Sequence, residues 1–111
     1  MRSERERQSL IDIAENIDLA VSFAEGLDEA AFATDLKSYY AVVRCLEIIS
    51  EASRTLSDEL KARHPELPWK QIAGSGNIYR HDYGQVAHSM VWITLHRSLP
   101  SLKAAVDSEL G

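Results

Sequence analysis

The 111-residue sequence has few of the residues that cross-link or interrupt a chain. Its single cysteine, Cys45, cannot form an internal disulfide or a Cys-x-x-Cys metal site, which excludes a disulfide-stapled secreted scaffold. Three prolines and five glycines leave few helix breakers. No apolar run approaches the roughly 18–20 residues of a transmembrane helix, and the mixed-charge N-terminus lacks the apolar segment of a signal peptide. We therefore expect no membrane association and a cytoplasmic location.

An excess of basic charge is also missing. Twelve Lys and Arg residues against 17 Asp and Glu residues give a formal net charge of −5, the wrong sign for nonspecific coating of nucleic acid. Residues 61–97 differ from the rest, because this span holds five basic residues, two acidic residues and all four histidines. The charge distribution is thus compatible with a local phosphate site on an acidic body.

The composition is that of a folded chain, with 45% hydrophobic and 26% charged residues. The length fits one domain, and we predict a single helical domain over residues 1–111. Apolar residues recur every three or four positions, which predicts amphipathic helices, and sustained two-residue alternation is absent. The predicted fold class is all-α, an up-and-down bundle of four to five helices.

The pattern places the elements as follows. The first helix runs from Leu10 to Ala24, with Gly26 at its C-terminal cap, and residues 28–33 form a short helical connector. A long helix follows from Asp35 to about residue 56, restarts over residues 57–60 and ends before Pro65. Pro68 and Trp69 open a single turn through Ile72, residues 74–76 break the chain, and residues 77–83 form a short helix. Another helix begins at Gln85 and ends near Ser98, and a last helix begins at Pro100.

The long helix carries a wide apolar stripe for so small a bundle. Its members are Leu36, Tyr39, Tyr40, Val43, Leu46, Ile49, Ala52 and Leu56. Either the core takes the whole stripe or part of it faces a second copy of the chain. We expect a homodimer, because self-association through long helices commonly buries such a surplus.

The segment from Gly74 to Gly84 is the richest in groups that can do chemistry. Asn77 and His81 are four apart and share a helical face, as do Gly76 and Arg80. Arg80 is expected to lean over the space beside Gly76, and exposed amides at the helix start would add an anion site. An imidazole moves protons near neutral pH and a guanidinium holds a phosphate, so this segment has the minimum for RNA cleavage by the substrate's own 2′-hydroxyl. The alternative is structural, with His81 capping the helix and Tyr83 packing.

Several blocks of the sequence occur in an order and spacing shared with a known family. They are residues 41–60 (AVVRCLEIISEASRTLSDEL), residues 64–74 (HPELPWKQIAG), residues 77–83 (NIYRHDY), Val91-Trp92 and Leu99-Pro100. Through these blocks, residues 5–108 resemble the HepT-like family of the HEPN superfamily.

The resemblance implies an all-helical, HEPN-like homodimer that acts as the ribonuclease toxin of a toxin–antitoxin pair and needs no cofactor. The implied partner is an MntA-like minimal nucleotidyltransferase, which neutralises the toxin by transferring AMP to the motif tyrosine, here Tyr83. The candidate catalytic residues are His81, Arg80 and Asn77, and the implied substrate is RNA.

The sequence departs from the family motif at one position. The family usually has an arginine five residues before the histidine, where this chain has Gly76. One hypothesis is that Arg80 supplies the missing cation, together with Arg44 from the long helix. The alternative is a catalytically weakened dimer that serves as a binding partner and substrate of a nucleotidyltransferase.

Other polar residues are weaker candidates. Arg44, Glu47 and Glu51 of the long helix either line the cleft or form surface ion pairs. His88 and His96 are too far from His81 along a helix to share one ion, so we expect no metal site. The two tryptophans, Trp69 and Trp92, are expected to anchor packing.

Overall fold

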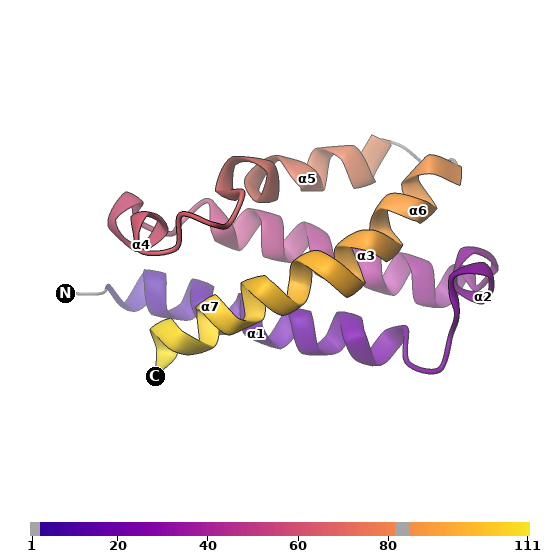
Figure 1. Ribbon diagram of the computed structural model, residues 1–111, viewed down its shortest axis with the longest axis horizontal. Coiled ribbons are helices and arrows are strands. Elements are labelled where there is room, and N and C mark those ends of the chain that lie inside the picture. Colours follow the sequence, from indigo (N-terminus) through magenta and orange to yellow (C-terminus); the bar gives the residue numbers. More distant parts are fainter. Residues whose placement is uncertain (1–2, 82–84) are drawn as a thin grey trace.

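The computed structural model describes the backbone of residues 3–81 and 85–111 and the side chains of residues 3–76 and 87–111. All regular structure in this part of the chain is helical, in four long segments that alternate in direction (Figure 1). They are α1 (Glu4–Phe23), α3 (Leu36–Ser53), α5 (Trp69–His81) and a continuous rod of α6 (Gln85–Ile93), the π-helical segment η1 (Thr94–Ser98) and α7 (Leu99–Leu110). The short helices α2 (Glu29–Thr34) and α4 (Asp58–Ala62) join α1 to α3 and α3 to α5. The predicted all-α up-and-down bundle is confirmed.

Local sequence sets where the first four helices begin. A side-chain oxygen at each start accepts a hydrogen bond from a backbone N–H three residues later, at 2.8–3.1 Å. The capping residues are Ser3, Asp28, Asp35 and Ser57. Each such cap stabilises its helix by about 1 kcal/mol, because it satisfies an amide that has no partner within the helix.

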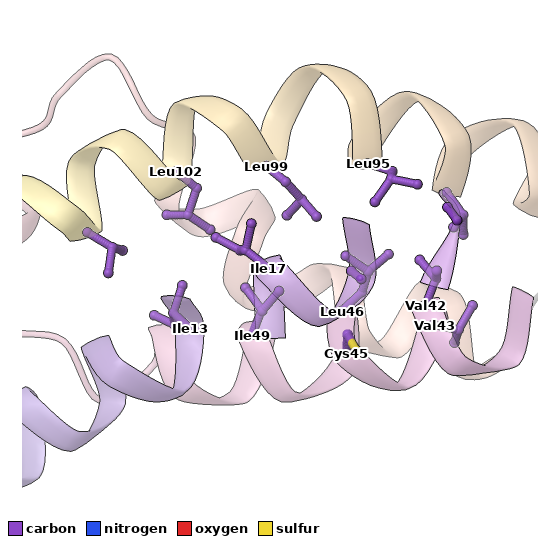
Figure 2. Close-up of a cluster of buried hydrophobic side chains, with 14 of the residues drawn as sticks. Ile13, Ile17, Val42, Val43, Cys45, Leu46, Ile49, Leu95, Leu99 and Leu102 are labelled. Carbon is purple, nitrogen blue, oxygen red and sulfur yellow. The ribbon is translucent and has the colours of Figure 1, made fainter. Parts of the chain in front are cut away.

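The core lies where the C-terminal rod crosses α1 and α3. Leu95, Leu99 and Leu102 point from the rod toward α3 and the isoleucines of α1 (Figure 2). On the α3 side the buried residues are Val42, Val43, Cys45, Leu46 and Ile49. Burial raises the pKa of the Cys45 thiol, so this residue serves the core as a neutral side chain.

The π-helical segment keeps the rod's apolar residues on the core. Val91, Leu95 and Leu99 are spaced four apart, which on a regular α-helix makes the line of side chains drift around the axis. A π turn holds one more residue than an α turn, so it corrects that drift. Leu95 and Leu99 therefore both remain buried, at 3% and 2% exposed. The predicted exchange between two helices at Ser98 and Pro100 is wrong, because the rod passes through both residues without leaving the helical conformation.

A second boundary prediction also fails. The expected single turn at Trp69–Ile72 and the expected break at residues 74–76 are replaced by one 13-residue helix, α5. Pro68 stands directly before this helix and Trp69 anchors it, because the indole N–H donates to the carbonyls of Lys61 (3.2 Å) and His64 (3.0 Å). None of the described helices combines the length and the apolar character that crossing a membrane requires.

Candidate functional site

Helix α5 meets α3 most closely at Gly76. The Gly76 N–H donates to the hydroxyl of Ser50 at 3.2 Å, and both residues are buried. A Cβ added at Gly76 would lie 3.1 Å from Ser50 Oγ and 3.3 Å from Ser50 Cβ, with the Cα of Glu47 at 3.9 Å. A glycine at this position lets the two helices approach this closely without displacing the Ser50 side chain.

The carbonyl of Ala73, one turn earlier in α5, accepts hydrogen bonds from Ser50 of α3 and from Arg54, the residue that caps the C-terminus of α3. Ser50 Oγ donates to it at 2.8 Å, and Arg54 donates through Nε at 3.0 Å and Nη2 at 2.8 Å. The third nitrogen of Arg54 lies 3.6 Å from the Glu51 carboxylate. Ser50 and Arg54 are four apart on one face of α3, so together they fix the distance and the register of α5 on α3.

One expectation about Gly76 is wrong. Because α5 begins at Trp69, Gly76 is an internal helical residue and its amide is not at a helix start that could bind an anion. The Arg80 side chain, which was expected to lean over Gly76, lies outside the described residues, and a Cβ at Gly76 would meet Ser50 and the backbone of α3 at Glu47. The glycine serves helix packing rather than close approach of a ligand.

The unbroken helix gives the motif positions a definite register. Positions 77 and 81 follow the exposed residues Lys70 and Gly74 along one side of α5, in steps of three and four. Position 80 is four after Gly76 and lies on the side that packs against α3, about 40° around the axis from Gly76. Positions 80 and 81 are therefore about 100° apart.

The side chains of the predicted catalytic residues Asn77, Arg80 and His81 lie outside the described part of the structure, as does the whole of Tyr83. Their assignment as site residues stays a prediction from the sequence.

The three predicted cleft residues of α3 have different surroundings. Arg44 is exposed, and Glu47 is half-buried beside the α5 contact at Gly76. Glu51 is exposed, and its carboxylate lies 3.6 Å from the guanidinium of Arg54. Of the three, Glu47 is the one that the structure brings next to α5.

A cluster of ionisable side chains joins α7 to the segment between α4 and α5. Glu109 of α7 accepts two hydrogen bonds from the Arg63 guanidinium, at 3.0 and 2.8 Å, and its Oε2 lies 2.7 Å from His64 Nε2. The contact with Arg63, followed by that with His64, lowers the pKa of Glu109 from 4.5 to about 2. This cluster ties the C-terminal helix to the α4–α5 junction.

Ser50 and Arg54 were not among the residues singled out from the sequence. The available signal was a serine within the apolar stripe of the long helix, followed four residues later by an arginine. That signal was weak, because a serine facing a core usually bonds to its own helix and only the tertiary contact reveals a second helix as its partner.

The chain folds as an up-and-down helical bundle, with Asn77 and His81 in its third long helix and Tyr83 two residues later in the sequence, and the family match makes it a HEPN-type protein. Within that class the chain belongs to the HepT-like family, since the family model described as "Ribonuclease HepT-like" matches residues 13–109.

Curated relatives agree with the family match. A probable ribonuclease HepT of Thermococcus cleftensis is 39% identical over 98 residues, covering 88% of this chain and 89% of that protein. A candidate RNase of Methanocaldococcus jannaschii is 33% identical over 98 residues, covering 88% and 90%. Another candidate RNase, from Caldanaerobacter subterraneus, is 32% identical over 104 residues, covering 94% and 93%. No solved structure is significantly similar to this chain.

Proposed function

We propose that this chain is an endoribonuclease toxin that cleaves RNA without a metal ion and is neutralised by a nucleotidyltransferase antitoxin. His81 acts as the acid and base, Arg80 holds the scissile phosphate, and Asn77 completes the site. The observation that carries the proposal is membership of the HepT-like family over residues 13–109, together with the His81-x-Tyr83 motif within that span.

The register of α5 supports this assignment. Positions 77 and 81 continue the exposed side of the helix marked by Lys70 and Gly74, which is where residues that meet a polymeric substrate are needed. Position 80 lies on the side toward α3, one turn after Gly76, which is next to Glu47 of α3.

RNA supplies the nucleophile for the reaction. His81 takes the proton of a 2′-hydroxyl, and the 2′-oxygen forms a bond to the adjacent phosphorus as the bond from phosphorus to the 5′-oxygen breaks. The imidazolium then returns the proton to the departing 5′-oxygen. Arg80 stabilises the negative charge that grows on the phosphate oxygens. The products carry a 2′,3′-cyclic phosphate and a 5′-hydroxyl.

The proposed partner acts on the same motif. The hydroxyl oxygen of Tyr83 attacks the α-phosphorus of ATP bound to an MntA-like nucleotidyltransferase, and pyrophosphate leaves. A bulky AMP group two residues from His81 blocks access of RNA.

We also propose that two copies pair through the exposed end of α3. Leu36 and Tyr40 are 58% and 53% exposed, although the rest of their stripe is largely buried in the core. They lie on the side of α3 that α5 covers further along the helix, so pairing there would bring two motifs close together.

Purified protein incubated with RNA tests the proposal. We expect cleavage that persists in the presence of a chelator, leaves 2′,3′-cyclic phosphate ends and is lost in His81→Ala. His96→Ala is the matched control, because His96 is exposed and lies outside the motif. Loss of activity with chelator, or products with 3′-hydroxyl ends, would show that the mechanism is wrong.

The replacement of the motif arginine by Gly76 favours a second candidate function. In this alternative the chain is a catalytically weakened dimer that presents Tyr83 to the nucleotidyltransferase without cutting RNA. Intact mass after incubation with ATP and that enzyme would then show AMP on the protein, while cleavage would be absent or unaffected by Arg80→Ala. A drop in cleavage on Arg80→Ala favours the nuclease.

A further inference from the structure

The hydroxyl of Ser50 is fully used by helix α5. It donates to the Ala73 carbonyl at 2.8 Å and accepts from the Gly76 N–H at 3.2 Å, and the residue is 2% exposed. A side chain that bonds to two backbone groups of a neighbouring helix, away from water, restrains that helix in distance, rotation and axial register at once.

We propose that Ser50 and Gly76 form a positioning contact for the nuclease site, with Ser50 as a positioning residue and Gly76 as the gap into which it fits. The expected effect on the rate of RNA cleavage rests on the proposed function, whereas the contact between Ser50 and Gly76 does not. Ser50 does not touch the reacting atoms. It acts through α5, whose last turn carries motif positions 77–81.

The helix geometry links the contact to the motif. Position 80 follows Gly76 by four residues on the side facing α3, and position 81 follows it by five. Moving Gly76 away from Ser50 therefore shifts position 80 away from Glu47 and changes the direction in which position 81 projects. Misplacement of reacting groups by about 1 Å can cost about a hundredfold in rate, and smaller shifts cost less.

The contact also accounts for the glycine at the place of the motif arginine. With Ser50 Oγ 3.1 Å and Ser50 Cβ 3.3 Å from an added Cβ, a side chain at position 76 requires Ser50 to move by a few tenths of an ångström. Arg54 bonds to the same Ala73 carbonyl and resists that movement. A side chain at position 76, the motif arginine included, therefore disturbs the contact of Ser50 with α5.

Two glycines of α5 provide a matched experiment. Gly76→Ala adds a methyl group against Ser50, whereas Gly74→Ala adds the same group to the same helix where nothing lies within 4 Å. The gain in helix propensity is equal in both variants, so it cancels. We expect kcat for RNA cleavage to fall about tenfold in Gly76→Ala, with KM near the wild-type value, and to change much less in Gly74→Ala.

Ser50→Ala removes the two hydrogen bonds without adding an atom, so it tests the contact even if Gly76→Ala does not fold. We expect kcat to fall in Ser50→Ala as well. The double variant Ser50→Gly/Gly76→Ala makes room for the methyl group, and we expect it to recover part of the kcat lost in Gly76→Ala.

A spectroscopic readout separates this inference from the proposed function. In protein labelled with ¹³C-histidine, the NMR titration of His81 should change in Ser50→Ala and Gly76→Ala but not in Gly74→Ala. His64, which contacts Glu109 of α7 and lies before α5 in the chain, serves as the internal control. If wild-type protein cleaves no RNA, the proposed function fails and the titration alone judges the contact. Unchanged His81 titration, or equal kcat in Gly76→Ala and Gly74→Ala, overturns the positioning role.

Discussion

At Gly76 a neighbouring side chain limits which residue the position can hold. Ser50 lies 3.1 Å (Oγ) and 3.3 Å (Cβ) from where a Cβ would stand, so an arginine at this place, as in the family motif, would displace Ser50. The glycine that replaces the motif arginine therefore goes together with the packing of Ser50 against α5. A substitution that restores the motif is expected to harm the protein.

We predict that Gly76→Arg lowers the free energy of unfolding by about 1–3 kcal/mol, because overpacking a close helix contact forces the helices apart. RNA cleavage should not increase. Chemical denaturation and the cleavage rate check both statements, with Gly74→Arg as the control at a position where an added Cβ meets nothing within 4 Å. A Gly76→Arg protein that is as stable as the control and cleaves faster would contradict the prediction.

The candidate site could be predicted from the sequence only as a set of residues. The motif residues His81 and Tyr83 are recognisable by their spacing, and Asn77 by its place four before His81. Ser50, whose hydroxyl bonds to the helix that carries these residues, is 26 residues before Gly76 in the chain. No local pattern records that contact, because it depends on how two helices dock.

Among the elements, α7 is held to the rest of the bundle by a polar cluster at its C-terminal end. Glu109 has a side chain only 9% exposed and bonds to Arg63 and His64. The folded-state pKa of Glu109 is about 2, below its ordinary value of 4.5. The ionised carboxylate is therefore more stable in the folded protein than in the unfolded chain.

From the direction of this shift, the cluster contributes its full stability above about pH 4.5 and loses it as the pH falls toward about 2. We predict that Glu109→Gln lowers the free energy of unfolding by about 1 kcal/mol at pH 7, a modest value because Arg63 is partly open to solvent. Denaturation curves measured at roughly pH 3 to pH 7 should show that the difference in unfolding free energy between the variant and wild type becomes smaller as the pH falls. A difference that does not depend on pH would rule out the carboxylate charge as its cause.

Element boundaries were predictable where a side chain acts on its own helix. Asp35 and Ser57 cap the helices that follow them, and Gly26, with a φ of 82°, turns the chain after α1. The boundaries at Gly74–Gly76 and at Ser98–Pro100 were not predictable in this way. In both places packing against other helices maintains the helix through residues that locally favour ending it.

For the whole molecule, the open question is what covers the exposed end of α3. The core accounts for most of the apolar stripe and leaves Leu36 and Tyr40 in solvent. Large exposed apolar side chains next to each other on one helix face are typical of an association surface.

We predict that Tyr40→Glu shifts the protein toward the monomer and reduces RNA cleavage, because a charge at the centre of a self-complementary interface is repeated on both copies. Leu19→Glu is the control, since Leu19 on α1 is 46% exposed and lies outside the α3 stripe. Analytical ultracentrifugation and the cleavage assay measure the two effects. If Tyr40→Glu and Leu19→Glu have the same sedimentation and activity as wild type, the proposed pairing through α3 is wrong.

The sequence by itself determined the helical class, the helix starts at Asp35 and Ser57, the apolar faces and the motif that identifies the family, because each of these depends on residues within a few turns of one another. Tertiary structure decided that α5 passes unbroken through Gly74, Ser75 and Gly76. Glycine in a helix interior costs about 0.5–1 kcal/mol relative to alanine, which favours a break when the segment is considered alone. Contacts of Ser50 and Arg54 with the backbone of α5 offset that cost, and they exist only once α3 and α5 have packed together.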